Sequence, residues 1–292
     1  MNFNIKNDFK DIVKNILSTI YGISQDTLSD DYNTLVIQLS KFIRQRVILE
    51  RKWNVEISSK INIPNNLKAG FESLVNALEE GKGILRYTTT RIDYIEHDDM
   101  MLDCDGFYHF HLSNLPYANN PNFNERTDER AFVYCNTKTS TAYIVDIYKH
   151  GAEKNNIKDR IYKLWREFPE ACKYSIHEGK LLATFDDKDV KELRKNQINT
   201  GIQLDANHFY MPCFGLTTAG TSSLDTFYLI NTNRELETLN NLIINVFLPK
   251  MRNENITDIK IYNRGFSIFL KMLSHSKTKL DILLVDSICP IN

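Results

Sequence analysis

The sequence has few of the residues that form linkers, metal clusters and membrane spans. It contains 11 glycines and 7 prolines in 292 residues, which argues against long flexible linkers. Its five cysteines include no Cys-x-x-Cys pair, so we expect reduced thiols and no zinc held by cysteines. No segment approaches the roughly 20 apolar residues that cross a bilayer, and the N-terminus lacks a signal-peptide pattern. These absences predict a soluble, cytoplasmic protein without a membrane partner.

An excess of positive charge is also missing. The 36 lysines and arginines are balanced by 37 aspartates and glutamates, which gives a formal net charge of −1. Proteins that bind nucleic acid through their overall electrostatic field are usually strongly basic. Any contact of this chain with nucleic acid must therefore come from a local cluster of basic residues.

Three successive regions together predict an α+β protein. Residues 1–95 carry apolar side chains at helical spacing, so we expect a helical N-terminal region. Residues 96–200 contain the clearest strand patterns and should form a central, mostly antiparallel sheet. Residues 201–292 are expected to form a C-terminal α+β region packed against the central one.

Two segments within these regions predict a particular helix face and a particular strand. The helix that follows residue 156 should bury Ile157, Ile161 and Leu164 and keep its basic residues, including Arg160, on the outside. Residues 225–231, with the sequence DTFYLIN, are interpreted as a strand.

The segment from Asp98 to Gly151 concentrates the residues that are able to carry chemistry. It contains the sequence FYHFH, and alternate side chains of a strand lie on the same face of a sheet. Phe107, His109 and His111 should therefore share one face, while the intervening aromatic residues occupy the other. A loop with two arginines and two further strands then lead the chain to a third histidine.

This set of residues suits the cleavage of RNA without a metal ion or other cofactor. Histidine transfers protons near neutral pH, and arginine binds phosphate oxygens through paired hydrogen bonds. We expect His109, His111 and His150 to act as acid and base, and Arg126, Arg130 and Lys149 to contact phosphate. RNA would be the partner, and the residue types are similar to those that RelE-type ribonuclease toxins use on compact antiparallel sheets.

Two other interpretations remain open. Asp105, His109 and His111 could instead provide nitrogen and oxygen ligands for a metal-dependent hydrolase. Alternatively, the histidines pack among aromatic residues without catalysis, and the chain is a binding or assembly module for nucleic acid or for a regulatory protein. The spatial convergence of the histidines discriminates the catalytic interpretations from the binding module.

Residues 60–170 resemble an uncharacterised bacterial family. The resemblance is carried by DDMMLDCDGFYHFHLSN, ERTDERAFVYCN and AYIVDIYKHG, which match a G-[IF]-x-H-[FL]-H-L element, an Arg-Thr pair and a strand that ends in histidine. The matching positions are Asp99, Leu102, Gly106, His109, His111, Leu112, Arg126, Thr127 and His150. Membership would imply an accessory role in phage defence or growth control, and it singles out the same histidines.

Overall fold

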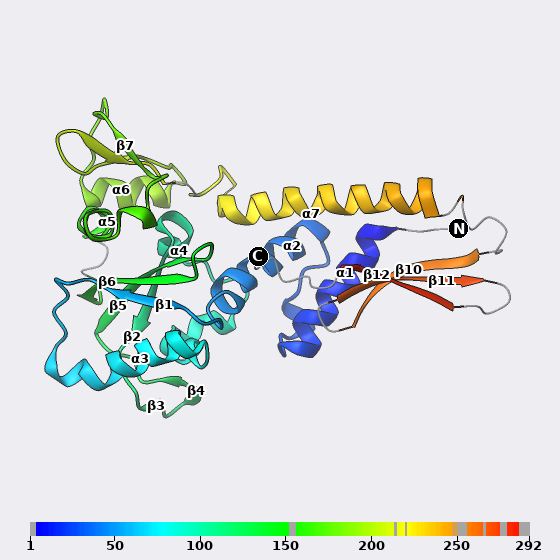
Figure 1. Ribbon diagram of the computed structural model, residues 1–292, viewed down its shortest axis with the longest axis horizontal. Helices are drawn as coiled ribbons and strands as arrows, with labels where there is room; N and C mark the ends of the chain where they lie inside the picture. Colours follow the sequence, from blue (N-terminus) through cyan, green and yellow to red (C-terminus); the bar gives the residue numbers. More distant parts are fainter. Residues whose placement is uncertain are drawn as a thin grey trace. The chain divides into compact units, whose positions relative to one another are not determined.

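The computed structural model describes residues 4–151, 156–212, 215–219, 221–247, 249, 256–264, 267–274 and 279–285. Helices and mixed sheets make it an α+β protein with a helical N-terminus, as predicted (Figure 1). The chain divides into two compact units, one from Arg44 to Leu224 and one that combines the chain up to Ile43 with the chain from Asp225. These boundaries differ from the three consecutive regions expected from the sequence, because the second unit joins the two ends of the chain.

The unit that contains both ends of the chain consists of helices and an antiparallel sheet. Its elements are α1 (Ile5–Asn15), α2 (Tyr32–Phe42), nearly all of α7 (Ser223–Leu242), β10 (Ile256–Arg264), β11 (Ser267–Ser274) and β12 (Lys279–Val285), with the strands in the order β10-β11-β12. Ser40 at the end of α2 donates a hydrogen bond of 2.6 Å to the buried carboxylate of Asp225 in α7. The side chains of two distant segments are joined by this bond.

The prediction of a strand at residues 225–231 is wrong, because this segment lies inside α7. The buried side chains of α7 are Asp225, Thr232 and Leu236, which recur at helical and not at strand spacing. Two of the three are polar, and a search for apolar periodicity does not register them.

The unit from Arg44 to Leu224 is built on a four-stranded sheet. Its strands are β1 (Asn54–Ile57), β2 (Phe107–His111), β5 (Glu129–Asn136) and β6 (Thr141–Lys149), in the order β1-β6-β5-β2. Every neighbouring pair is antiparallel except β1 and β6, which run parallel. The mostly antiparallel sheet was predicted, whereas β1 lies in the region expected to be helical.

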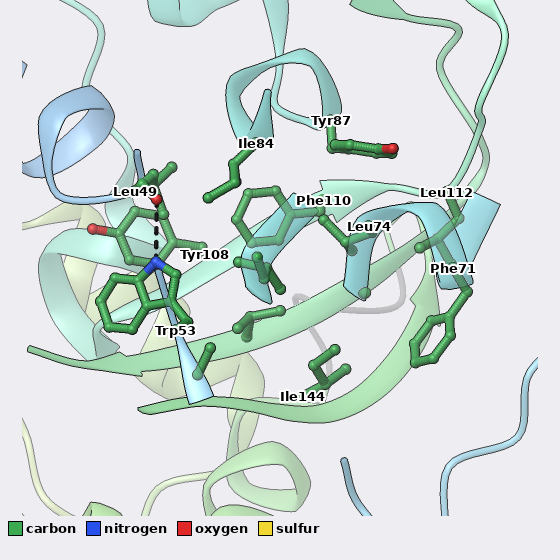
Figure 2. Packing of buried hydrophobic residues seen from close by; sticks show 14 of the residues in the cluster. Leu49, Trp53, Phe71, Leu74, Ile84, Tyr87, Tyr108, Phe110, Leu112 and Ile144 are labelled. Atoms are coloured by element: carbon green, nitrogen blue, oxygen red, sulfur yellow. Dashed lines mark hydrogen bonds between the residues drawn. The ribbon is translucent and has the colours of Figure 1, made fainter. Parts of the chain in front are cut away.

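Helices cover both faces of this sheet, with α3 (Lys68–Glu80) on one side and α5 (Ile157–Glu167) and α6 (Asp187–Lys195) on the other (Figure 1). Tyr108 and Phe110 pack with Leu74 of α3 in the first core (Figure 2). Phe107 belongs to the second core, together with Phe132 of β5. The predicted alternation along FYHFH is therefore confirmed.

Shorter elements complete this unit. They are α4 (Met100–Asp105), β3 (Pro116–Tyr117), β4 (Asn120–Asn124), β7 (Ile176–Glu178), β8 (Ile202–Gln203) and β9 (His208–Tyr210). The helix α4 leads directly into β2 through Gly106, whose φ of +74° is accessible to glycine at little cost. Among the helices that the structure describes, none combines the length and the apolar character needed to span a bilayer.

The contact between α3 and the end of β2 leaves no room for a side chain at Gly70. A Cβ atom there would lie 1.9 Å from the carbonyl oxygen of Leu112, the residue that follows His111. The absence of a side chain at Gly70 thus allows the helix to approach the strand that carries the histidines.

We predict that Gly70→Ala destabilises the protein by about 2 kcal/mol or more, because α3 must move away from the backbone at Leu112. Helix propensity alone would favour the change by about 1 kcal/mol, so the sign of the effect is informative. Urea unfolding should give an unchanged or slightly higher stability for the control Asn76→Ala, on the exposed face of α3. A Gly70→Ala protein as stable as the wild type would contradict this packing.

Candidate functional site

A cleft of about 870 Å³ opens on the side of the sheet that carries α5 and α6. Five of the six residues expected to act on RNA line it: His109, His111, His150, Arg126 and Arg130. The exception is Lys149, which is exposed and does not line the cleft. This cleft is therefore the candidate functional site.

The strand register explains which side chains face the cleft. His111 pairs with Arg130 across β2 and β5, and Arg130 pairs with Tyr148 across β5 and β6, so these three side chains share a face. Lys149 follows Tyr148 and consequently points to the opposite face. The alternation that brings His111 and Arg130 together thus removes Lys149 from the site.

His111 is almost completely enclosed, with 1% of its surface exposed. Its Nδ1 lies 3.1 Å from both the amide nitrogen and the carbonyl oxygen of Thr127. If the Thr127 N–H donates to Nδ1, the proton of the neutral ring lies on Nε2; if Nδ1–H instead donates to the carbonyl oxygen, Nε2 is an acceptor. That Nε2 is buried without a hydrogen-bond partner in the described structure. His111 therefore has one ring nitrogen to offer to a ligand in the cleft.

The charge state of His111 follows from its surroundings. Burial, and then the positive charges of Arg130 and Arg126, lower its pKa to about 3. His111 is consequently neutral at physiological pH. It is suited to donating a hydrogen bond and not to acting as a charged acid.

His109 lies beside a carboxylate that α4 holds in place. Its Nδ1 is 3.6 Å from Oδ2 of Asp99, and 16% of the His109 side chain is exposed. Asp99 is the N-cap of α4, where Oδ1 accepts hydrogen bonds from the backbone N–H groups of Met101 and Leu102. The hydrogen bonds that Asp99 accepts from α4 thus hold its carboxylate beside the imidazole of His109.

The loop that carries Arg126 is tied to the strands on both sides. The Thr127 hydroxyl accepts a 2.9 Å hydrogen bond from the backbone N–H of Leu112 at the end of β2. The backbone N–H of His150 donates to the carbonyl oxygen of Asp128 at 2.7 Å. The loop residues between β4 and β5 are thereby fixed next to His111 and His150.

A buried ion cluster lies where α4, α5 and α6 meet. The side chain of Asp105 is 0% exposed and accepts two 2.7 Å hydrogen bonds from the guanidinium of Arg194. Arg160 approaches the same carboxylate at 3.5 Å, with its guanidinium over the rings of Phe107 and Phe132. Two arginines thus share the carboxylate of Asp105, and the charge of Asp187 also acts on Arg160.

The pKa values of the two arginines move in opposite directions. Burial lowers the pKa of Arg160, and the charge of Asp105 offsets only part of this shift. Burial also disfavours the charged form of Arg194, but the charge and hydrogen bonds of Asp105 outweigh it and raise the pKa. Asp105 therefore holds Arg194 more firmly than Arg160.

The expectation that Arg160 lies on the outside of its helix is wrong, since 1% of it is exposed. Its position explains the error, because residues 157, 160, 161 and 164 form one helical stripe. The two ring contacts and Asp105 provide the environment that allows an arginine into this stripe.

The metal site suggested as an alternative is not assembled. The oxygens of Asp105 are engaged by Arg194 and Arg160, so Asp105 does not join His109 and His111 in a ligand set. Within the described ranges, no group of three or more histidine, cysteine, aspartate or glutamate side chains is arranged to hold a metal ion.

Several cations in the cleft were not expected from the sequence. Lys191, Arg194 and Lys195 of α6 line it, as do Arg91 and Arg160. The spacing of the three α6 residues, i, i+3 and i+4, places them on one helix face and is the signal that could have identified them. In the part of the chain that the structure describes, Arg91, Arg126 and Lys191 make no ion pair, and they leave positive charge open to a ligand.

Comparisons of this chain with protein-family models, with curated proteins and with solved structures return no match. The basis for assigning a function is therefore the chemistry of the cleft itself. That chemistry consists of three histidines, of which His111 is neutral, an aspartate beside His109, and cations in excess of carboxylates.

We predict that His111 makes the stability of the protein fall as the pH drops below about 6.5. Its folded-state pKa of about 3 lies below the unfolded value, so the unfolded chain binds the extra proton and is favoured by up to about 1.4 kcal/mol per pH unit. Urea unfolding at pH 7, 6 and 5 should show a shallower loss for His111→Gln than for the wild type. His177→Gln, an exposed control outside the cleft, should keep the wild-type slope, and equal slopes for all three proteins would refute the assignment.

Removal of the shared carboxylate should be strongly destabilising. Asp105→Asn removes the buried carboxylate that Arg194 and Arg160 share, and we expect a loss of about 3–5 kcal/mol in the free energy of unfolding. The control Glu170→Gln breaks the exposed pair with Lys173 and should leave the free energy of unfolding close to the wild-type value. Similar losses in the two variants would contradict the role given to Asp105.

Proposed function

We propose that the cleft binds RNA and cleaves it by metal-independent acid–base catalysis. The observation that carries this proposal is that His109 with its aspartate, His150, His111 and two arginines line one cleft. A cleft with unpaired cations favours an anionic substrate, and a phosphodiester meets this requirement.

The side chains of the cleft indicate where the nucleophile comes from. No serine or cysteine is among its described lining residues. Of its two threonines, Thr127 uses its hydroxyl to bridge Leu112 and Glu129, and Thr89 accepts from the backbone N–H of Arg91. The nucleophile is therefore supplied by the substrate, as the 2′-hydroxyl of a ribose. This requirement favours RNA over DNA.

Each side chain has a role that follows from its environment. His109, stabilised by Asp99, removes the proton of the 2′-hydroxyl. The 2′-oxygen attacks phosphorus, the bond from phosphorus to the 5′-oxygen breaks, and the exposed His150 donates a proton to that leaving oxygen. The products are a 2′,3′-cyclic phosphate and a 5′-hydroxyl.

The remaining polar groups act on the phosphate. Arg126 and Arg130 neutralise the charge that develops on its non-bridging oxygens. In the tautomer that carries its proton on Nε2, His111 donates a hydrogen bond to a phosphate oxygen and carries no charge itself. A phosphate could in this way be held by three groups from β2, β5 and the loop before β5.

A second candidate is an RNA-binding module that does not cleave. The observation in its favour is the low pKa of His111, about 3, which removes His111 from the groups able to exchange protons near neutral pH. Phage defence or growth control is the proposed setting of either activity, and it is supported only by the resemblance of residues 60–170 to the bacterial family described above.

We expect the wild-type protein to cleave single-stranded RNA in the presence of EDTA and to leave DNA of the same sequence intact. His109→Gln should lower the rate by about 10²–10⁴-fold, because it removes the base. Asp99→Asn, which keeps an N-cap for α4, should lower it by about tenfold or more, because the adjacent charge is lost. Gel analysis of labelled substrates measures both effects.

The exposed His177→Gln and Lys149→Ala, both outside the cleft, serve as controls and should cleave at the wild-type rate. Cleavage that EDTA abolishes, or equal cleavage of DNA, would exclude the mechanism. RNA binding without any cleavage would favour the binding module.

A further inference from the structure

The charges of the cleft are distributed unevenly between its two walls. The helical wall consists of Arg160 of α5 and of Lys191, Arg194 and Lys195 of α6; Asp105 pairs with Arg160 and Arg194, and the charge of Asp187 also acts on Arg160. The strand wall provides three cations, Arg91, Arg126 and Arg130, and three carboxylates, Asp98, Asp99 and Asp128. The excess of positive charge therefore belongs to the helical wall.

The helical wall is fixed by hydrogen bonds and ion pairs and is not merely a group of surface lysines. Both oxygens of Asp187 in α6 accept hydrogen bonds from the first backbone N–H groups of α5, which joins the two helices. Arg160 and Arg194 are buried in the ion cluster with Asp105. Lys191 is half-buried and makes no ion pair within the described residues. Lys195 pairs with Glu192 at an exposed site, where the interaction is weak.

The size of this charge excess indicates the kind of phosphate that would bind. A phosphodiester carries one negative charge, whereas a terminal phosphate monoester carries about −1.5 to −2 at pH 7 and three acceptor oxygens. Lys191, which makes no ion pair within the described residues and lines the cleft together with Arg194 and Arg160, is best compensated by the more highly charged group. The helical wall thus matches the end of an RNA chain better than its interior.

The volume of the cleft agrees with this assignment. Pockets that enclose small ligands typically measure about 300–1,000 Å³, and the cleft at about 870 Å³ falls in this range. It would hold the end of an oligonucleotide and not a long tract of it.

We propose that the helical wall binds the terminal phosphate monoester of the RNA, so that substrates with a phosphorylated end are preferred. The identity of the polymer rests on the proposed function, whereas the recognition of a monoester rests on the helical wall. Lys191 is a specificity residue in this arrangement, since its ammonium group is the cation of the wall that the protein leaves without a carboxylate.

The test is a binding measurement in EDTA on single-stranded oligonucleotides that are 2′-O-methylated throughout and so cannot be cleaved. Three versions of one sequence carry a 5′-phosphate, a 3′-phosphate or hydroxyls at both ends, and fluorescence anisotropy gives the affinities. We expect the wild type to bind one phosphorylated version about tenfold more tightly than the hydroxyl version. Lys191→Gln should lose this preference, and Lys191→Arg should keep it.

Lys188→Gln is the matched control, because Lys188 is exposed on the same helix and does not line the cleft. Equal affinities for the three versions, or an equal effect of Lys188→Gln and Lys191→Gln, would overturn the inference and leave the proposed ribonuclease untouched. Adenosine 5′-monophosphate that competes as strongly as the phosphorylated oligonucleotide would assign the wall to free nucleotides and would also overturn it. A phosphate preference in a protein that cleaves nothing would retain the inference and reject the ribonuclease.

Discussion

The carboxylate of Asp105 is the constraint on which the cleft depends. It ends α4, binds Arg194 of α6 through two hydrogen bonds and approaches Arg160 of α5, so three helices meet at one buried charge. Gly106 follows in a left-handed conformation and turns the chain directly into β2. Asp105, which contacts both helices of the cleft, thus also lies directly before the strand that carries His109 and His111.

Stability and chemistry make opposite demands on the polar groups of this cleft. Desolvation keeps His111 neutral and would disfavour the charge of Arg160, whereas ligand binding requires positive charge close to an enclosed space. The protein meets both demands by pairing its deepest cations with a single carboxylate and leaving Arg126 and Lys191 without one. An anionic ligand would supply the missing negative charge, and its binding would favour the folded state.

The sequence predicts the structure correctly where one short local pattern determines which side chains are buried together. The alternation in FYHFH correctly assigned Tyr108 and Phe110 to one core and Phe107 to the other. Prediction fails where long-range pairing determines a strand, as in β1, where Asn54 pairs in parallel with Thr141 of β6, 87 positions later, and where the strand's own pattern is too short to identify. The sequence alone suggests Asp105 as a metal ligand because it lies close to His109 and His111. The two arginines that bind Asp105 are distant in sequence, and only the fold shows that they contact it.

The most direct test of the ribonuclease proposal uses a DNA oligonucleotide that contains a single ribonucleotide. If the 2′-hydroxyl is the nucleophile and His109 is its base, the protein in EDTA should cut only at the phosphate that follows the ribose. Mass spectrometry should then identify a 2′,3′-cyclic phosphate on one product and a 5′-hydroxyl on the other. Cleavage at any other position, a product that ends in a 3′-hydroxyl, or an intact oligonucleotide would contradict the proposal.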